Sequence, residues 1–209
     1  MRILIFGASG ATGHELVKQA LTSDHLITAF VRDPSKLNLK NKNLEIVQGD
    51  VKDYASVENA IKGHDAVLSA LGVSKPLKND PVVIEGVKNI LLAMEKLNIM
   101  RFVYLSFLAV GQGRNDAGFL IKHVISRIVH NEIEDHQEKE ALIKASNREW
   151  TIIHPPKLTN GVKKGVYRIG EDLKSTSFFP TLSRADLADF MIKQLNDNRF
   201  LRKTVRIMN

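Results

Sequence analysis

The sequence predicts an α/β fold, with one doubly wound parallel sheet and helices on both of its faces. Short apolar runs alternate with longer segments in which apolar residues recur at spacings of three and four. A glycine-rich segment, Gly7–Gly13, lies between the first apolar run and the first of the longer segments. Strand–helix–strand units of this kind build a parallel sheet through right-handed crossovers. No repeat or polar linker divides the chain, so we expect a single domain over residues 1–209.

Each element follows from its own run of residues. In chain order, the expected strands are Arg2–Phe6, Leu26–Val31, Leu44–Gln48, Ala66–Ser69, Arg101–Ser106, Trp150–His154 and Thr204–Ile207. The expected helices are Thr12–Leu21, Tyr54–Ile61, Val82–Leu97, Ala117–Ile133, a further helix ending near Ala145, and Leu187–Leu195. The segment from Ser183 to Asp186 predicts a capping box, with Asp in place of Glu, before the last helix.

Composition limits the classes of protein to be considered. The chain has no cysteine, which excludes disulfides, zinc–thiolate sites and thiol nucleophiles. Its longest uninterrupted apolar run has five residues, Ile90–Met94, so we expect no membrane span and no membrane partner. The N-terminal apolar stretch is only Ile3–Phe6, which is not typical of a secretory signal. We therefore expect a cytoplasmic protein.

The charge is a second constraint. Thirty Lys and Arg against twenty-three Asp and Glu give a net charge of +7, which is compatible with nucleic-acid binding. The basic residues are scattered, however, and acidic residues interrupt them between Glu132 and Glu140. We therefore expect a solvated basic surface and no nucleic-acid partner, although such a surface also helps to attract a phosphorylated ligand.

The Gly7–Gly13 segment reads Gly-Ala-Ser-Gly-Ala-Thr-Gly and has the composition of a loop that holds a pyrophosphate. Glycines permit a tight turn, close approach of the backbone to the phosphates, and close packing of helix on strand. The helix N-terminus that follows offers unpaired N–H groups and a partial positive charge. Ser9 and Thr12 add hydroxyl donors. This pattern predicts a Rossmann-like NAD(P) site; the alternative is a glycine-rich turn without a ligand.

The end of the second strand bears on the choice of nucleotide. NAD-selective sites usually carry an acidic residue there, about twenty residues beyond the loop, which accepts from the ribose 2′-hydroxyl. Here Arg32 occupies this region and is suited to a bidentate contact with a 2′-phosphate, with Lys36 in support. Asp33 is the alternative, as the acceptor of an NAD site. We expect NADP(H) to be preferred over NAD(H).

Several motifs together indicate a family. The ordered set is the glycine loop, Val31–Pro34, Gly49–Val51, Ser69–Gly72, Tyr104–Ser106 and Ile153–Pro156. In this order the chain resembles the atypical short-chain dehydrogenase/reductase family, specifically the NAD(P)H-binding group around biliverdin-IXβ/flavin reductase and NmrA-like proteins. The resemblance covers nearly the whole chain.

The resemblance implies roles for individual residues. The pyrophosphate would be held by Gly7, Ser9, Gly10, Ala11, Thr12 and Gly13. Arg32 would bind the 2′-phosphate, and Asp50 and Val51 would border the adenine. The nicotinamide side would be formed by Ala70, Leu71, Gly72, Ser106, Pro155 and Pro156.

The chain departs from this family in two places. Ordinary short-chain dehydrogenases use a Tyr-x-x-x-Lys pair, but Tyr54, Tyr104 and Tyr167 are followed four residues later by Glu, Leu and Glu. This departure argues against ordinary alcohol dehydrogenation and against sugar epimerisation. Flavin-reductase relatives have a histidine after the Pro-Pro pair, where this chain has Lys157.

Three residues are candidate catalytic groups. Ser106 could bond the nicotinamide or orient an acceptor, and its alternative role is to satisfy the local backbone at a strand end. His136 is a candidate proton donor or a solvated helical histidine. Lys157 could donate to a carbonyl or is a plain loop lysine. His123 and His130 could share a helix face, but no third ligand accompanies them, so we expect no metal. His14, His25 and His64 are expected at the surface.

These observations lead to two functional hypotheses. The first is an NADPH-dependent oxidoreductase that transfers hydride to a small conjugated acceptor of quinone or flavin type, because such an acceptor needs no strong enzymatic acid. Its substrate side would come mainly from residues 107–182. The apolar face of the helix Ala117–Ile133 either packs over the sheet as core or forms one wall of an acceptor pocket. The second is a non-catalytic NADP(H)-sensing regulatory binding protein of NmrA-like type. The sequence leaves the oligomeric state open.

Overall fold

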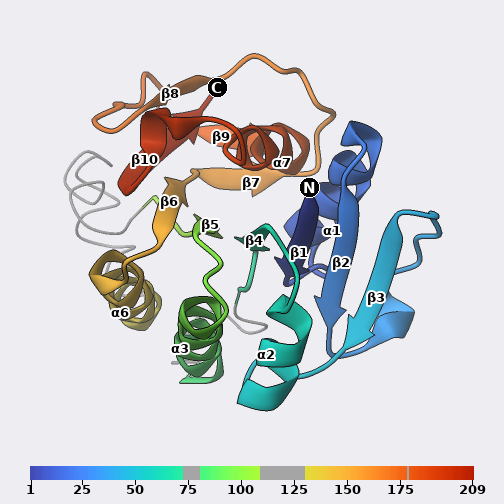
Figure 1. The fold of residues 1–209 in the computed structure, drawn as a ribbon. Coiled ribbons are helices and arrows are strands. Elements are labelled where there is room, and N and C mark those ends of the chain that lie inside the picture. Colours follow the sequence, from blue (N-terminus) through green and yellow to red (C-terminus); the bar gives the residue numbers. More distant parts are fainter. Residues whose placement is uncertain (73–80, 109–129, 178) are drawn as a thin grey trace.

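The computed structural model describes residues 1–72, 81–108, 130–177 and 179–209, and its centre is an eight-stranded sheet (Figure 1). The strand order is β3-β2-β1-β4-β5-β6-β10-β8, and β7 and β9 form a separate parallel pair. In the large sheet β8 pairs with β10 in antiparallel orientation, whereas the other pairs are parallel. The strands are β1 (Arg2–Phe6), β2 (Leu26–Val31), β3 (Leu44–Gln48), β4 (Ala66–Ser69), β5 (Arg101–Leu105), β6 (Glu149–His154), β7 (Lys157–Thr159), β8 (Arg168–Gly170), β9 (Thr181–Ser183) and β10 (Lys203–Met208).

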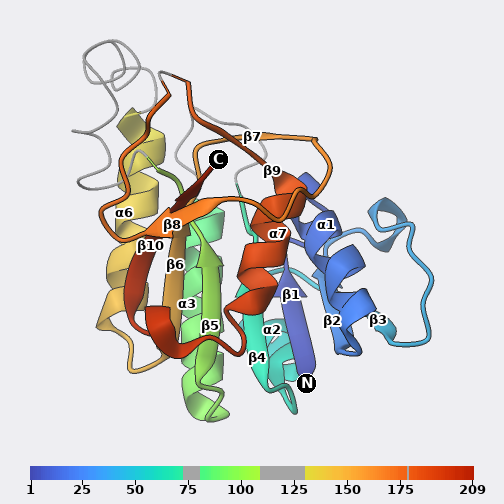
Figure 2. The same ribbon diagram turned by 90° about the horizontal axis from the view of Figure 1, so that it is seen from above.

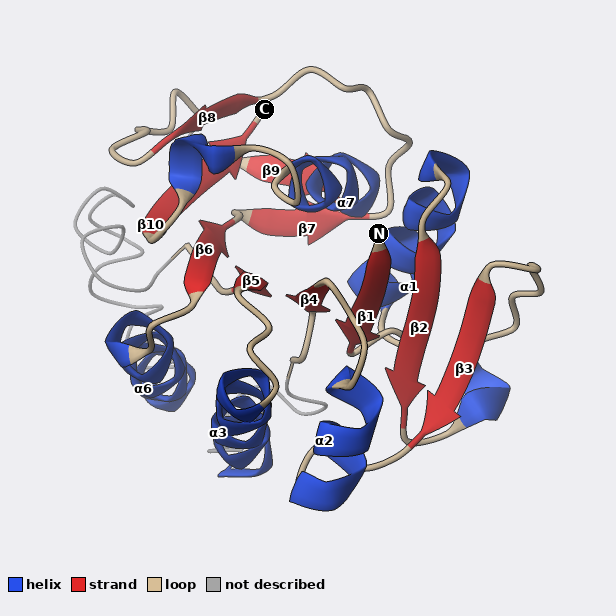
Figure 3. Cartoon of the chain, viewed as in Figure 1, coloured by secondary structure: helices blue, strands red, loops and turns tan. Residues whose placement is uncertain are grey.

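Helices cover both faces of this sheet (Figure 3). One face carries α1 (Ala11–Ala20) and α7 (Arg184–Lys193), which pack against each other. The other face carries α2 (Tyr54–Ile61), α3 (Pro81–Lys96) and α6 (His130–Ala145), seen side by side from above in Figure 2. Short 3-10 turns occupy Leu21–Ser23, Pro34–Lys36 and Asn198–Phe200. The expected doubly wound parallel fold is therefore confirmed.

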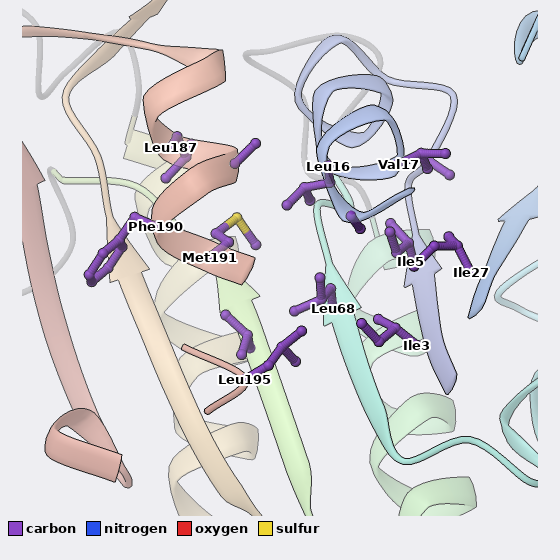
Figure 4. Packing of buried hydrophobic residues seen from close by; sticks show 14 of the residues in the cluster. Ile3, Ile5, Leu16, Val17, Ile27, Leu68, Leu187, Phe190, Met191 and Leu195 are labelled. Atoms are coloured by element: carbon purple, nitrogen blue, oxygen red, sulfur yellow. The ribbon is translucent and has the colours of Figure 1, made fainter. Parts of the chain in front are cut away.

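The alternation of side chains along each strand produces two apolar layers. Figure 4 shows the layer under α1 and α7, where Ile3, Ile5 and Leu68 of the sheet meet Leu16 and Leu187 of the helices. On the opposite face, intervening strand residues pack under α2, α3 and α6, and these include Leu4, Phe6, Val67, Phe102, Tyr104 and Ile152. Both faces of the central strands β1, β4 and β5 are buried, as is usual in a parallel sheet covered by helices on both sides.

The strand order reverses between β1 and β4. From β1 the chain builds outward through β2 to β3, then returns to place β4 on the other side of β1 and continues to β5 and β6. In open α/β sheets such a switch point leaves a crevice at the carboxyl ends of the strands, where ligands bind. The Gly7–Gly13 loop follows β1, and Ala70–Gly72 follow β4, so both lie at this point.

Several expected elements differ in detail. The structure adds β7, β8 and β9, which are only three residues long and were not expected. Helix α6 runs without a break from His130 to Ala145, whereas the sequence predicted a boundary after Ile133. The loop Gly111–Asp116 and the rest of the helix expected from Ala117 lie outside the described residues.

The expected capping box at the start of α7 is half confirmed. The Ser183 hydroxyl accepts from the backbone N–H of Asp186 at 2.9 Å, which is the N-cap interaction. The Asp186 carboxylate accepts from the Ser183 hydroxyl and from the backbone N–H groups of Lys164 and Gly165. It therefore ties a distant segment to the helix start.

His64 is buried, and its expected surface position was wrong. Its Nε2 lies 2.8 Å from the Thr28 hydroxyl, and its Nδ1 lies 3.3 Å from the carbonyl oxygen of Ile61. Burial lowers the pKa of His64, so the imidazole is held neutral by its surroundings.

We predict that Gly86→Ala destabilises the fold although alanine is the better helix former. A Cβ at Gly86, in the middle of α3, would lie 2.7 Å from Val51 Cγ2 and 2.9 Å from Val51 Cβ. Overpacking of this kind costs about 1–3 kcal/mol of unfolding free energy. Urea unfolding measures the effect, and Glu85→Ala, at an exposed position of the same helix, is the matched control. Equal stability of the two variants would contradict the close contact, and Val51→Ala should restore part of the loss.

Candidate functional site

The loop after β1 makes a backbone-to-backbone contact with the segment after β4. Gly7 has φ +74°, and a Cβ there would lie 2.5 Å from the Ala70 carbonyl oxygen and 2.8 Å from the Leu71 nitrogen. A Cβ at Gly13 would lie 2.0 Å from the Gly7 carbonyl oxygen. Both positions therefore admit only glycine without movement of the backbone, which explains why the loop needs glycine at its first and last residues.

The same loop exposes its backbone at the start of α1. Gly10 is the N-cap of α1, and a Cβ there would lie 3.3 Å from the Gly7 oxygen. Ser9, Gly10 and Ala11 are exposed, while Thr12 is buried at the first turn. The first N–H groups of a helix have no intrahelical partner and attract anions. The residues present therefore fit a dinucleotide pyrophosphate.

At the end of β2, the two candidates for nucleotide choice have different surroundings. Arg32 is exposed. The Asp33 carboxylate caps the turn Pro34–Lys36, with its Oδ1 accepting from the Ser35 hydroxyl at 2.6 Å and the Ser35 N–H at 3.1 Å. Hydrogen bonds from Ser35 lower the pKa of Asp33. One of its oxygens is therefore already engaged within its own turn.

The predicted adenine side lies at the start of the segment after β3. Asp50 is exposed and Val51 is buried against Gly86 of α3. The side chain of Asn89, also on α3, donates to the carbonyl oxygens of Val51 and Lys52 at 2.9 Å and 3.1 Å. Helix α3 thus fixes this segment through two residues, Gly86 and Asn89, that the sequence analysis did not single out.

On the predicted nicotinamide side, Ser106 follows β5. Ser69 of β4 lies beside Tyr104 of β5 in the parallel register, so Ala70–Gly72 and Ser106 leave the sheet along the same edge. The Ser106 N–H donates to the Ile153 carbonyl oxygen at 2.9 Å, which extends the pairing of β5 with β6. The backbone role expected as the alternative for Ser106 therefore exists, and its side chain makes separate contacts.

Those contacts join Ser106 to a buried carboxylate, Glu140 of α6. The Ser106 hydroxyl donates to Glu140 Oε1 at 2.6 Å, and His154 Nε2 lies 2.6 Å from the same oxygen. Lys144 Nζ lies 2.8 Å from Glu140 Oε2. His136, one turn before Glu140 on α6, places its Nδ1 3.3 Å from the Ser106 hydroxyl oxygen. Only 2% of Glu140 and 4% of His154 are exposed.

The surroundings set the charge of two of these groups. Burial opposes ionisation of Glu140, but hydrogen bonds from His154, Lys144 and Ser106 outweigh it and lower its pKa to about 2. Burial, together with the nearby Lys139 charge, lowers the pKa of His136 to about 3. Near neutral pH, Glu140 is therefore an anion and His136 is neutral. His136 is partly buried and bonded, unlike a solvated helical histidine.

The other residues predicted on this side are Pro155, Pro156 and Lys157. Pro155 and Pro156 are buried, and the Pro155 carbonyl oxygen accepts from the Leu108 N–H at 3.2 Å. Lys157 is exposed and belongs to β7, where it pairs with Thr181 of β9, so it does not lie in a loop. Lys139 is buried. Within the described ranges, no group of three or more His, Asp or Glu residues is arranged to hold a metal ion.

Glu140 and His154 are not among the candidate site residues that the sequence indicates. In the sequence Glu140 belongs to an acidic stretch that interrupts the basic residues, and His154 ends an expected strand. A signal was present, because residues four apart on a helix share a face and this spacing links His136 to Glu140. The partner strand could not be inferred, since the pairing of β5 with β6 is a tertiary contact.

Comparisons with known proteins agree with this architecture. The chain matches a family described as NAD(P)H-binding over residues 7–198. It is 26% identical over 219 aligned residues to UPF0659 protein YMR090W of Saccharomyces cerevisiae, covering 100% of this chain and 93% of that protein. It is 23% identical to photosystem II assembly factor Ycf39 of Synechocystis sp., covering 100% of this chain and 62% of that protein.

A solved structure extends the likeness to the fold. A short-chain dehydrogenase/reductase (wide type) from Veillonella parvula, in complex with NADP, superposes with a TM-score of 0.79 at 18% identity. The match covers 100% of this chain and 94% of that one. The fold and the glycine loop define a Rossmann-type dinucleotide-binding protein. The chain belongs to the NAD(P)H-binding family, in agreement with its resemblance to atypical short-chain dehydrogenases.

The structure also bears on membrane association. Among the helices in the described part of the chain, none has the length and apolar content needed to cross a bilayer.

We predict that His136 makes the fold sensitive to acid. Its pKa is about 3 in the folded chain against 6.5 for a free imidazole, so the unfolded chain binds more protons between these values. The stability contributed by a neutral His136 is therefore lost as the pH falls below about 6.5. Between about pH 7.5 and about pH 5, the unfolding free energy of His136→Gln, measured in urea, should fall less than that of the wild type. Parallel pH dependence of the two proteins would contradict the buried neutral state.

Proposed function

We propose that this chain is a cytoplasmic NADPH-dependent oxidoreductase that reduces a small conjugated acceptor of quinone or flavin type. One observation carries the proposal. The glycine loop, Ala70–Gly72 and Ser106 lie along the carboxyl edge of the sheet, and a buried carboxylate on α6 accepts from the Ser106 hydroxyl. The glycine loop and an oriented polar group on the same edge support hydride transfer from a bound dinucleotide.

The dinucleotide would be held by the residues already described. The N–H groups at the start of α1 and the hydroxyls of Ser9 and Thr12 would bind the pyrophosphate. The exposed guanidinium of Arg32 would pair with the 2′-phosphate. Asp33, engaged by Ser35, is the weaker candidate for a 2′-hydroxyl acceptor. This difference, together with the NADP-bound structural relative, supports NADPH over NADH.

The chemistry follows from what the side chains are able to do. Bound NADPH supplies the hydride. Ser106, His136 and Glu140 would orient the reacting groups through their hydrogen bonds, and placement alone lowers a barrier by several kcal/mol. The anion of a reduced conjugated acceptor is delocalised and takes its proton from water, so the absence of a Tyr-x-x-x-Lys pair is compatible with turnover. The acceptor would bind on the side formed by residues 107–182.

A second candidate is a regulatory protein that binds NADP(H) without turnover. The similarity of the whole chain to a protein named as a photosystem II assembly factor supports this regulatory candidate. The two candidates share the dinucleotide site and differ only in whether an acceptor is reduced.

We expect calorimetric titration to show NADPH binding more tightly than NADH. In Arg32→Ala the loss of a charge-assisted contact should weaken NADPH about tenfold or more and leave NADH nearly unchanged. Lys18→Ala is the control, because Lys18 is exposed and lies in the last turn of α1, at the opposite end of the helix from the glycine loop. Equal losses for both nucleotides in Arg32→Ala would remove the 2′-phosphate assignment. Failure to bind either nucleotide would remove the proposed function.

We expect NADPH oxidation to be stimulated by quinones or flavins in a spectrophotometric screen. Ser106→Ala should slow turnover at least about tenfold, since it removes an orienting group, while NADPH affinity changes much less. Binding without turnover across the acceptors would favour the regulatory candidate. An unchanged rate in Ser106→Ala would restrict Ser106 to its backbone role.

A further inference from the structure

The hydroxyl of Ser106 has one hydrogen to donate, and its neighbours determine where that hydrogen goes. Glu140 Oε1 lies 2.6 Å from the hydroxyl oxygen, and His136 Nδ1 lies 3.3 Å from it. An ionised carboxylate only accepts hydrogen bonds, so the short contact places the Ser106 hydrogen toward Glu140. The contact with His136 must then be made by a hydrogen on Nδ1.

The second contact on the carboxylate agrees with this assignment. His154 Nε2 also lies 2.6 Å from Glu140 Oε1, and an anion at this distance requires a hydrogen on that nitrogen. Lys144 donates to the other oxygen at 2.8 Å. Glu140 therefore receives three donors, from β6, from its own helix and from Ser106. This set of donors fixes the carboxylate as the acceptor of the cluster.

The consequence lies at His136. A neutral imidazole has one N–H, and here it is on Nδ1, which leaves Nε2 with a lone pair and no hydrogen. We propose that Glu140 is a positioning residue which, through Ser106, fixes the hydrogen of neutral His136 on Nδ1, so that Ser106 and His136 offer a ligand only hydrogen-bond acceptors. These acceptors are the remaining lone pair of Ser106 and Nε2 of His136.

The charged groups around His136 are consistent with a neutral ring. On its own helix lie Glu140 and the buried Lys139, and β6 contributes His154. Burial opposes protonation of His136 most strongly, the Lys139 charge opposes it as well, and Glu140 favours it. Tyr104 of β5 is fully buried and has its pKa raised by burial and then by Glu140. A second proton on the His136 ring would therefore be opposed by burial and by Lys139, with Glu140 as the opposing anion.

The ligand part of this inference rests on the proposed function. The carboxamide of nicotinamide carries an N–H₂ group, which is a donor of the required kind. A carbonyl group that only accepts hydrogen bonds, by contrast, finds no donor in Ser106 or His136. Ser106 and His136 would thus orient a nicotinamide through its amide hydrogens and would supply no proton to the acceptor.

Nuclear magnetic resonance determines directly which nitrogen of His136 carries the hydrogen. Two-bond ¹⁵N–¹H correlation spectra of the full-length, nucleotide-free protein distinguish Nδ1–H, Nε2–H and doubly protonated histidines. The chain has seven histidines, and the signals lost in His136→Gln identify His136. At about pH 7 we expect a protonated Nδ1 and an unprotonated Nε2 for this residue. A hydrogen on Nε2, or on both nitrogens, would overturn the proposal.

Two variants separate positioning from a merely structural effect. In Ser106→Ala and in Glu140→Gln, which keeps the side-chain shape, His136 should shift toward the Nε2–H form. Glu138→Gln is the matched control, because Glu138 lies on the same helix, is exposed and pairs with Lys88 at 3.8 Å. If the His136 hydrogen stays on Nδ1 in folded Ser106→Ala, the proposed action of Glu140 through Ser106 is overturned, even if Glu140→Gln does not fold.

Titration with NADPH then tests the ligand part. We expect the His136 Nε2 resonance to move when nucleotide binds, because it accepts a hydrogen bond. Binding that shifts amide resonances of the Gly7–Gly13 loop but leaves Nε2 unchanged would overturn the ligand part alone. No binding at all would overturn the proposed function and, with it, the ligand part, while the position of the imidazole hydrogen in the free protein would stand.

Discussion

The close approach of Gly7 to the backbone of Ala70 and Leu71 is the constraint on which the site depends. It joins the segments that follow β1 and β4 where the strand order reverses, so no side chain separates the phosphate loop from the segment predicted to border the nicotinamide. Gly13 sets a second distance, between the first turn of α1 and the loop itself. These contacts hold the loop and the N-terminus of α1 against the segment that follows the carboxyl end of β4, without the help of a ligand.

At the carboxyl ends of β5 and β6, hydrogen bonds to a buried carboxylate hold the structure together. Around Glu140 the structure buries a carboxylate and surrounds it with donors from β5, β6 and α6. A buried anion without partners would cost several kcal/mol, so the positions of these donors are coupled to one another. The cluster therefore aligns the end of two strands with a helix that follows the segment 109–129 in the chain.

The strands and helices with a periodic pattern of apolar residues were predictable, and the tertiary contacts were not. Seven apolar or amphipathic segments, from Arg2–Phe6 to Val82–Leu97, match the structure to within one residue because their periodicity reflects burial on a sheet or a helix. The glycine loop was predictable because its spacing is dictated by local backbone geometry. Strands β7, β8 and β9 have three residues each, too few for any periodicity to register. His64 and Glu140 looked like surface charges because their partners come from elements far away in the sequence.

The position of β10 has a consequence for the order in which the chain acquires its structure. This strand lies inside the sheet, between β6 and β8, although β7, β8 and β9 all precede it in the chain. Until residues 203–208 leave the ribosome, β6 keeps an open edge whose backbone groups are available to other chains. Ribosome-bound chains ending before this strand should therefore be the species most prone to aggregation and most in need of a chaperone. Strand β8, although it precedes β10 in the chain, takes its place at this side of the sheet only by pairing with β10.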